Sequence, residues 1–402
     1  MREQIQQQAV DLAKTNNVLL LFSVRLGKTK TALDICSNFG NNHLIVTSEV
    51  LIQQGIEEEI EKWGFDKSHF TVICYDSLHK YRNDNFDVVV LDESEHITEK
   101  NYEHLVTLNP KRWVALCAKM SSDKKQLLRK LFKFSQLRVT YTEAIDMGIL
   151  SEPKFYILNL YLDNVNRNYI YTRHFKKYAK NAAVTIDFRE RYSFFKHPVN
   201  LNIRCTAQEY YTLLDENVEY RKNEYFKMRT EVMKNIWLQA GNSRKKWLGS
   251  YKTETAKEII NWMRNREKRF MVFTSTIAQC EELGRGDGVT HSKNTNLDAI
   301  KKFNNSEVDE LYVVDRGREG ITIYGIEEGL IIQASGSDTA NYQRAGRLGI
   351  AEKPVIYVLQ VKGTRDEDYV NKLREDIDSK FIEEIDYRKF MQNVESKIVE
   401  ED

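Results

Sequence analysis

A Gly-Lys-Thr triplet, Gly27 to Thr29, follows the apolar run "VLLLF" and precedes a helix-like pattern. A strand, a glycine turn and a helix in this order would direct backbone N–H groups at a phosphate. In that geometry Lys28 would neutralise β/γ-phosphate oxygens and Thr29 would coordinate Mg²⁺. A phosphate loop of this kind begins with a glycine where this chain has Phe22, so a chance triplet at a helix start is the alternative interpretation.

Two adjacent acids, Asp92 and Glu93, end a second apolar run in the stretch "FDVVVLDESEHI". Paired acids at the end of a buried strand are costly unless a cation or hydrogen bonds compensate them. At a phosphate site Asp92 would hold Mg²⁺, and Glu93 would position and deprotonate the attacking water. An acidic loop is the alternative, but the preceding strand–Gly-Lys-Thr–helix pattern favours the phosphate site.

A pair of arginines, Arg344 and Arg347, lies in the stretch "DTANYQRAGRLGI". Residues three apart share a face of a helix. Guanidinium groups brought from a second domain onto a γ-phosphate would stabilise transition-state charge, as an arginine finger does. A solvated basic helix start is the alternative interpretation of this segment alone.

The elements that must position these residues form two α/β series. In the first, apolar runs at 18–22, 43–47, 71–75, 87–92 and 113–117 alternate with helical patterns. These runs are rich in Val, Ile and Leu, which is typical of parallel strands buried on both faces of a doubly wound sheet. A second series, "RFMVFTS", "ELYVVD", "GLIIQAS" and "PVIYVLQ", occupies roughly 268–362.

The segment between the two series is different in character. It begins with the alternating stretch "KFYILNLYL" and continues through charged, Tyr-rich helical patterns. Within 166–197, basic residues that include Arg173, Lys176 and Lys177 interleave with aromatic residues such as Tyr169 and Tyr171. Basic groups that follow phosphates and rings that stack on bases would bind a single strand. An amphipathic helix with buried rings is the alternative, and "NSRKKWLGSYK" (242–252) is either a phosphate contact or a solvated interdomain face.

Composition limits the classes of protein that the chain can represent. Its 402 residues are 41% hydrophobic and 30% charged, which is ordinary for a globular protein of two or three domains. The formal net charge of +1 means that nucleic-acid affinity must come from local patches. Five scattered cysteines without a Cys-x-x-Cys pair indicate neither zinc nor disulfides and fit a reducing cytoplasm. The polar start does not resemble a signal peptide, and no apolar run is long enough for a membrane span.

Taken together, the motifs resemble those of superfamily 2 helicases and translocases, with phage-type and Swi/Snf-like members closest. "SVRLGKT" resembles motif I and "LDESEH" the Asp-Glu-x-His box of motif II, while "ALCAKM" stands where motif III is expected. "FMVFTSTIAQCEEL", "VVDRGREGITI" and "YQRAGRLGI" resemble motifs IV, V and VI, and "QQQAV" resembles the upstream Gln motif. The resemblance covers roughly 1–150 and 265–362, with six motifs in the family's order.

The resemblance implies two RecA-like domains with ATP and Mg²⁺ in the cleft between them. The expected domains are 1–150 (ATP-binding), 151–265 (basic, aromatic and largely helical), 266–365 (helicase C-terminal) and 366–402 (an acidic helical tail). Expected catalytic residues are Lys28, Asp92, Glu93, Gln343, Arg344 and Arg347, with Thr29 and Asp92 on Mg²⁺. Expected ATP contacts are Gln6 (at adenine), Arg25, Gly27, Lys28, Thr29 and Gly320. Expected nucleic-acid contacts are Thr47, Ser48, Thr274, Ser275, Thr322, Arg173, Lys176 and Lys177.

The chain departs from the family pattern at three places. His96 is one position late, Lys119-Met120 replaces the hydroxyl pair of motif III, and Ile350 stands where motif VI has another arginine. The expected function is an ATP-dependent helicase or translocase on DNA in preference to RNA, working as a monomer away from membranes. A degenerate helicase fold that only binds nucleic acid, or a motor subunit that needs a nuclease or remodelling partner, remains the alternative.

Overall fold

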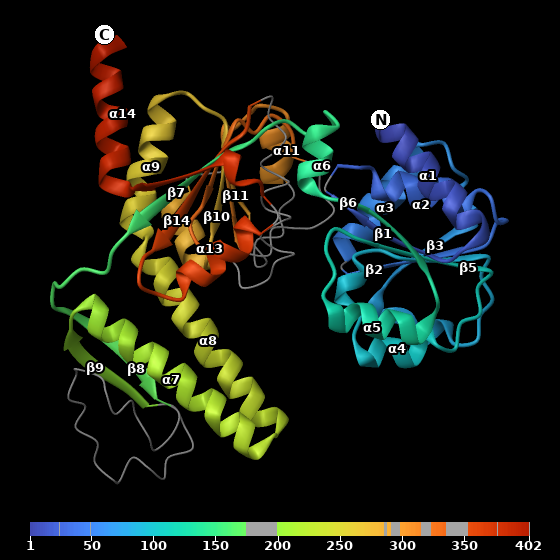
Figure 1. The fold of residues 1–402 in the computed structure, drawn as a ribbon, viewed down its shortest axis with the longest axis horizontal. Helices are drawn as coiled ribbons and strands as arrows, with labels where there is room; N and C mark the ends of the chain where they lie inside the picture. The colour runs from blue at the N-terminus through green and yellow to red at the C-terminus, as the bar shows by residue number, and fades with distance from the viewer. Residues whose placement is uncertain are drawn as a thin grey trace.

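The computed structural model comprises two α/β units and a smaller helical part (Figure 1). It describes residues 1–23, 25–48, 50–173, 199–284, 288–290, 298–314, 323–334, 353–375 and 377–401.

The first α/β unit is a six-stranded parallel sheet with the strand order β3-β2-β4-β5-β1-β6. Its strands are β1 (Val18–Phe22), β2 (His43–Thr47), β3 (Phe70–Cys74), β4 (Val88–Leu91), β5 (Arg112–Cys117) and β6 (Ser135–Val139). Its helices are α1 (Arg2–Thr15), α2 (Lys28–Cys36), α3 (Val50–Lys62), α4 (Glu99–Leu105), α5 (Ser122–Leu131) and α6 (Tyr141–Asp146). The five strands expected here are confirmed to within about a residue or two.

Alternation along β1 explains why its sequence is apolar throughout. Leu20 and Phe22 join one hydrophobic cluster, whereas Leu19 and Leu21 join the cluster on the opposite face of the sheet. Because helices cover both faces, every position of a central parallel strand is buried, as the apolar runs predicted. The edge strand β6 was not predicted, since its "SQLRV" sequence alternates between partly buried and exposed residues.

The second α/β unit is a seven-stranded sheet with the order β11-β12-β10-β13-β14-β7-β15, in which all described pairs are parallel. Its strands are β7 (Lys154–Leu160), β10 (Phe270–Thr274), β11 (Val289–Thr290), β12 (Glu310–Val314), β13 (Glu328–Ile331), β14 (Val355–Val361) and β15 (Ile382–Asp386). Its helices are α9 (Thr253–Asn265), α10 (Ile277–Leu283), α11 (Asp298–Asn304), α13 (Asp366–Arg374) and α14 (Tyr387–Glu401).

Two strands of this sheet come from segments that the sequence assigned elsewhere. β7 was expected in the middle segment, but it lies between β14 and β15, with Lys154 paired to Val355. β15 lies in the tail, which was expected to be acidic and helical. In both cases the pairing joins residues far apart in the chain, so the local pattern could not reveal it.

The middle part contains a two-stranded antiparallel sheet and two long helices that extend from the second unit (Figure 1). These elements are β8 (Arg167–Arg173), β9 (Val199–Cys205), α7 (Ala207–Met228) and α8 (Glu231–Tyr251). The start of the basic and aromatic stretch is therefore a strand. None of the helices described here is both long and apolar enough to traverse a bilayer.

Candidate active site

The predicted phosphate loop joins the end of β1 to the start of α2, and it contacts helix α1. The amide of Gln6 donates a hydrogen bond to the Leu26 carbonyl oxygen at 2.9 Å. Gly27, which precedes α2, has a left-handed backbone with φ of 80°, and a Cβ placed there would lie 2.3 Å from Gln6 Nε2. The left-handed conformation favours glycine at this position, and a Cβ there would also displace the Gln6 amide.

Lys28 is the first residue of α2 and lies over the loop. Its Nζ donates to the Phe22 carbonyl oxygen at 3.2 Å, so the ammonium group closes the turn between the strand and the helix. Gly27 has no side chain to cap the N-terminus of α2. The first backbone N–H groups of this helix therefore receive no hydrogen bond from a capping side chain. An ammonium beside uncapped helix N–H groups suits a phosphate.

The two acids follow β4, at the same edge of the sheet as the phosphate loop. Asp92 is 8% exposed, and its backbone N–H donates to the Val46 carbonyl oxygen at 2.8 Å. The buried Tyr75 hydroxyl donates to the Asp92 carbonyl oxygen at 3.0 Å. Burial raises the pKa of Tyr75, and the nearby carboxylate of Asp92 adds to this effect. Tyr75 thus stays protonated and anchors the strand end that carries both acids.

Glu93 has a left-handed backbone with φ of 47°, and its carboxylate accepts a hydrogen bond from the Ser48 hydroxyl. The next residue, Ser94, donates to the Leu116 carbonyl oxygen at 3.0 Å and ties the acidic turn to β5. The displaced His96 is exposed at the end of a short turn. Oxygen ligands for Mg²⁺ are available from the Thr29 hydroxyl, in the first turn of α2, and from Asp92, so the donor chemistry fits this cation.

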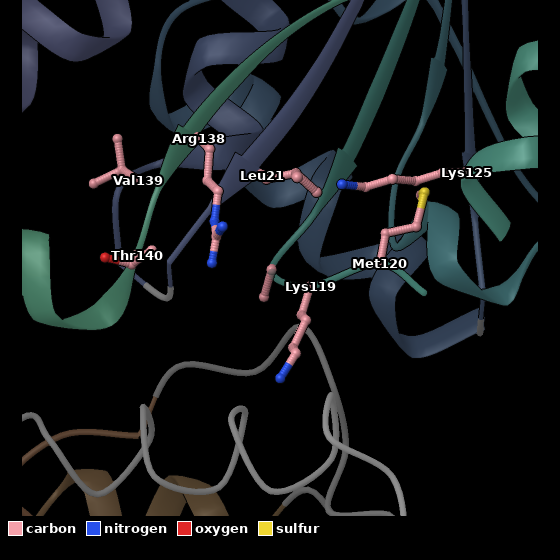
Figure 2. Close-up of a pocket in the computed structure, with 8 residues that line it drawn as sticks. Leu21, Lys119, Met120, Lys125, Arg138, Val139 and Thr140 are labelled. Atoms are coloured by element: carbon pink, nitrogen blue, oxygen red, sulfur yellow. The ribbon is translucent and has the colours of Figure 1, made fainter. Parts of the chain in front are cut away.

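A pocket of about 210 Å³ opens at the ends of β1, β5 and β6 (Figure 2). Three cationic side chains contribute to it: Lys119, Lys125 and Arg138. Figure 2 shows the ammonium of Lys125 directed toward Leu21, whereas Lys119 extends in another direction. Lys119 Nζ lies 3.7 Å from a carboxylate oxygen of Glu375, at the end of α13. The lysine that replaces the motif III hydroxyl therefore links the first unit to the second.

The predicted nucleic-acid contacts divide into buried and accessible groups. Thr47 is fully buried, and Thr274 is 2% exposed with its hydroxyl donating to the Val313 carbonyl oxygen at 3.0 Å. Ser48 and Ser275 are half-buried. The Ser275 hydroxyl donates to the Gln279 side chain at 3.0 Å. Only the two serines, among these four residues, present part of their surface to solvent.

In the described part of the middle segment, several of the aromatic and basic side chains make contacts within the protein. Tyr171 is 2% exposed, and Tyr169 stacks on Tyr210 with 4.4 Å between ring centroids. In the stretch 242–252, Arg244 pairs with Asp215 and Lys252 is fully buried. Tyr171, Arg244 and Lys252 are thus buried within the protein, and Tyr169 is half-buried against Tyr210.

Several predicted residues lie outside the described part of the chain. They are Gly320, Thr322, Gln343, Arg344, Arg347, Lys176, Lys177 and the side chain of Arg173. The expected arginine finger therefore stays a prediction from the sequence.

Three contacts of the site were not foreseen from the sequence: Gln6 with Leu26, Tyr75 with Asp92, and Ser48 with Glu93. The last of these follows from adjacency of β2 and β4, because both residues come just after the paired strands. That adjacency is a property of the strand order, which the chain order of the apolar runs does not reveal.

The whole chain is similar in fold to solved helicase structures. The helicase domain of Hef from Pyrococcus furiosus matches with a TM-score of 0.50 at 14% identity, covering 92% of this chain and 97% of that one. Dbp5 from S. cerevisiae, bound to RNA and ADP BeF3, matches with a TM-score of 0.56 at 11% identity, covering 99% of this chain and 93% of that one. No protein-family model and no curated protein sequence matches the chain. The chain therefore shares the fold of these solved structures, with two parallel α/β sheets.

Proposed function

We propose that this protein is an ATP-dependent helicase or translocase that moves along nucleic acid, with DNA as the preferred track. The observation that carries the proposal is the convergence of two groups at one sheet edge. Lys28 lies beside the uncapped N-terminus of α2, and the Asp92–Glu93 pair follows β4, with a single strand, β5, between β4 and β1. Phosphate-binding and water-activating groups in this arrangement suit hydrolysis of a nucleoside triphosphate.

Each residue of the site has a distinct part in this proposal. Lys28 neutralises the β/γ-phosphate oxygens, and Glu93 orients and deprotonates the attacking water. Mg²⁺ held by the Thr29 hydroxyl and the Asp92 carboxylate would supply charge compensation for the phosphates. Gln6, whose amide supports the loop at Leu26, is further proposed to contact adenine.

The second unit is proposed to complete the site and to provide the motion. Gln343, Arg344 and Arg347 would reach the γ-phosphate, and Gly320 would contact the nucleotide. Closure of the two units on ATP and reopening after hydrolysis would step the protein along a strand by a shift in population. Ser48, Ser275 and Thr322 are the proposed contacts with that strand.

A second candidate is a motor subunit that requires a protein partner. It is favoured by apolar side chains exposed near the junction of α7 and α8, where Phe226 is 48%, Met228 is 54% and Val232 is 64% exposed. Apolar groups gathered on a projecting helical pair are typical of protein contact surfaces. A role in phage replication, recombination or repair, in the host cytoplasm, would suit either candidate.

The test is steady-state ATP hydrolysis, measured alone and with single-stranded DNA, duplex DNA, forked DNA or single-stranded RNA. We expect one polymer to stimulate hydrolysis and Lys28→Ala to abolish it. Lys30→Ala is the matched control, because Lys30 lies on the same helix and pairs with Asp34 at the surface. Binding of nucleic acid without any ATP hydrolysis would contradict the proposed motor function. The remaining candidates would then be a degenerate helicase fold that only binds nucleic acid and a motor subunit that requires a partner.

A further inference from the structure

The hydrogen bond between Ser48 and Glu93 is built by strand pairing. Ser48 comes one residue after β2, and Glu93 comes two residues after β4. The two strands are neighbours, with Val46 beside Leu91, and the Asp92 N–H continues the ladder to the Val46 carbonyl oxygen. The pairing therefore places the Ser48 hydroxyl beside the Glu93 carboxylate, which accepts a hydrogen bond from this hydroxyl.

The direction of this hydrogen bond matters for the proposed chemistry. The strand order is β2-β4-β5-β1, so β2 lies on one side of β4 and the phosphate loop after β1 lies on the other. A carboxylate that accepts from Ser48 is drawn toward β2, away from the phosphate loop. The left-handed backbone of Glu93, with φ of 47°, is uncommon for a residue with a side chain and accompanies this orientation.

We propose that Ser48 is a positioning residue that holds the Glu93 carboxylate away from the attacking water until nucleic acid binds. This inference rests on the function proposed above. A serine hydroxyl has one hydrogen to donate, so it cannot donate to Glu93 and to a phosphate oxygen of the nucleic-acid backbone at the same time. When the backbone phosphate accepts from Ser48, the carboxylate loses that donor and turns toward the phosphate loop.

The exchange couples the two sites without any long-range change of structure. Ser48 is a predicted contact with nucleic acid, and Glu93 is the predicted base. The single hydrogen of the Ser48 hydroxyl therefore links the nucleic-acid site to the catalytic carboxylate. By linkage, nucleic acid favours the active orientation of Glu93 to the same extent that this orientation favours binding of nucleic acid. Hydrolysis of ATP is thereby restricted to protein that is on its track.

The experiment compares Ser48→Ala with Ser48→Thr, which keeps the hydroxyl. Ser48→Ala is expected to raise kcat for ATP in the absence of nucleic acid by roughly tenfold, the effect of losing one hydrogen bond to a charged group. The ratio of stimulated to unstimulated kcat should fall accordingly, with little change in KM for ATP. Ser48→Thr keeps a hydroxyl that can donate to Glu93, so its unstimulated kcat should lie well below that of Ser48→Ala. Ser68→Ala is the matched control, because the exposed Ser68 hydroxyl bonds to Asp66 far from the site.

The outcomes separate this inference from the proposed function. An unstimulated kcat that stays unchanged or falls in Ser48→Ala, while the unaltered protein is stimulated and Lys28→Ala is inactive, would overturn the role of Ser48 alone. Absence of hydrolysis in the unaltered protein and in Ser48→Ala, with every polymer, would overturn both. A gain in unstimulated hydrolysis cannot arise from misfolding, so the expected result is distinct from simple damage.

Discussion

Lys252 and Asp366 form an ion pair in which both side chains are fully buried, with Nζ 2.5 Å from Oδ2. Lys252 lies between α8 and α9, and Asp366 begins α13. The Lys252 ammonium also donates to the carbonyl oxygens of Ile332 and Leu359, each at 2.9 Å. The pair therefore connects the junction of α8 and α9 to β13 and β14. The chain leads on from β13 toward the predicted arginines.

Removal of one partner of this pair should be strongly destabilising. Burial lowers the pKa of Lys252, and Asp366 opposes that effect, so each charge depends on the other. Lys252→Met is expected to reduce the free energy of unfolding by about 3–5 kcal/mol, because it leaves a buried carboxylate without its cation. Urea denaturation measures the change.

The control for this prediction is Lys14→Met, which breaks a surface pair with Asp11 in which both side chains are about half exposed. That change should cost less than about 1 kcal/mol. A double variant, Lys252→Met with Asp366→Leu, should regain part of the lost stability because no buried charge remains. Equal effects of Lys252→Met and Lys14→Met would contradict the importance of the buried pair.

Gly27→Ala should impair the phosphate loop. A Cβ at this position would lie 2.3 Å from Gln6 Nε2. The alanine would also have to adopt the left-handed backbone conformation of Gly27, with φ of 80°. We expect affinity for ATP to fall by roughly tenfold or more, about 1.4 kcal/mol, as measured by titration with a fluorescent ATP analogue. Gly64→Ala is the matched control: Gly64 has φ of 72° but nothing within 4 Å of its Cβ position. Similar loss of ATP affinity in both variants would indicate a general effect of backbone strain.

Tyr75→Phe removes the hydroxyl that anchors the Asp92 carbonyl oxygen. The free energy of unfolding is expected to fall by about 1 kcal/mol, the usual contribution of a buried hydrogen bond. Stimulated kcat should fall with KM for ATP nearly unchanged, because the strand end that carries the acids loosens while the phosphate loop is intact. Tyr81→Phe, in the same turn and with its ring near Phe86, serves as the control. A normal kcat in Tyr75→Phe would show that the anchor is dispensable for catalysis.

Glu384 on β15 provides a pH-dependent contribution to stability. Burial acts to raise its pKa, but hydrogen bonds from Arg374 and Asn159 outweigh this effect and lower the pKa to about 2. A carboxyl whose pKa is lower in the folded state stabilises the fold above its unfolded pKa and loses that contribution as pH falls. The destabilisation by Glu384→Gln, about 1–2 kcal/mol near neutral pH after allowance for solvent screening, should therefore shrink between about pH 5 and pH 2.

Urea denaturation of Glu384→Gln and of the unaltered protein, at about pH 7 and pH 3.5, measures how this destabilisation depends on pH. Glu383→Gln is the control, because Glu383 is the neighbouring residue of β15 and pairs with the exposed Lys154. A difference between Glu384→Gln and the unaltered protein that does not depend on pH would contradict the lowered pKa.

The central strands of the first sheet were predictable from the sequence, whereas two edge strands, β6 and β15, were not. β1, β2 and β4 are buried at every position, so their sequences are continuous apolar runs that indicate strands without further information. β6 exposes alternate residues, whereas β15 exposes the consecutive Glu383 and Glu384 and carries three acids in "IEEID". Strands of this kind are stabilised mainly by a partner from elsewhere in the chain, which a local pattern cannot reveal.

The sequence by itself determined the local units of the site: a strand, a glycine turn and a helix around Lys28, and a strand that ends in Asp92 and Glu93. Such units follow from apolar periodicity and from residues that only certain backbone conformations accept. The tertiary structure decided which strand ends lie side by side, and so it alone placed Ser48 on Glu93. It also decided that Lys252 is buried against Asp366, because burial depends on which distant elements pack together.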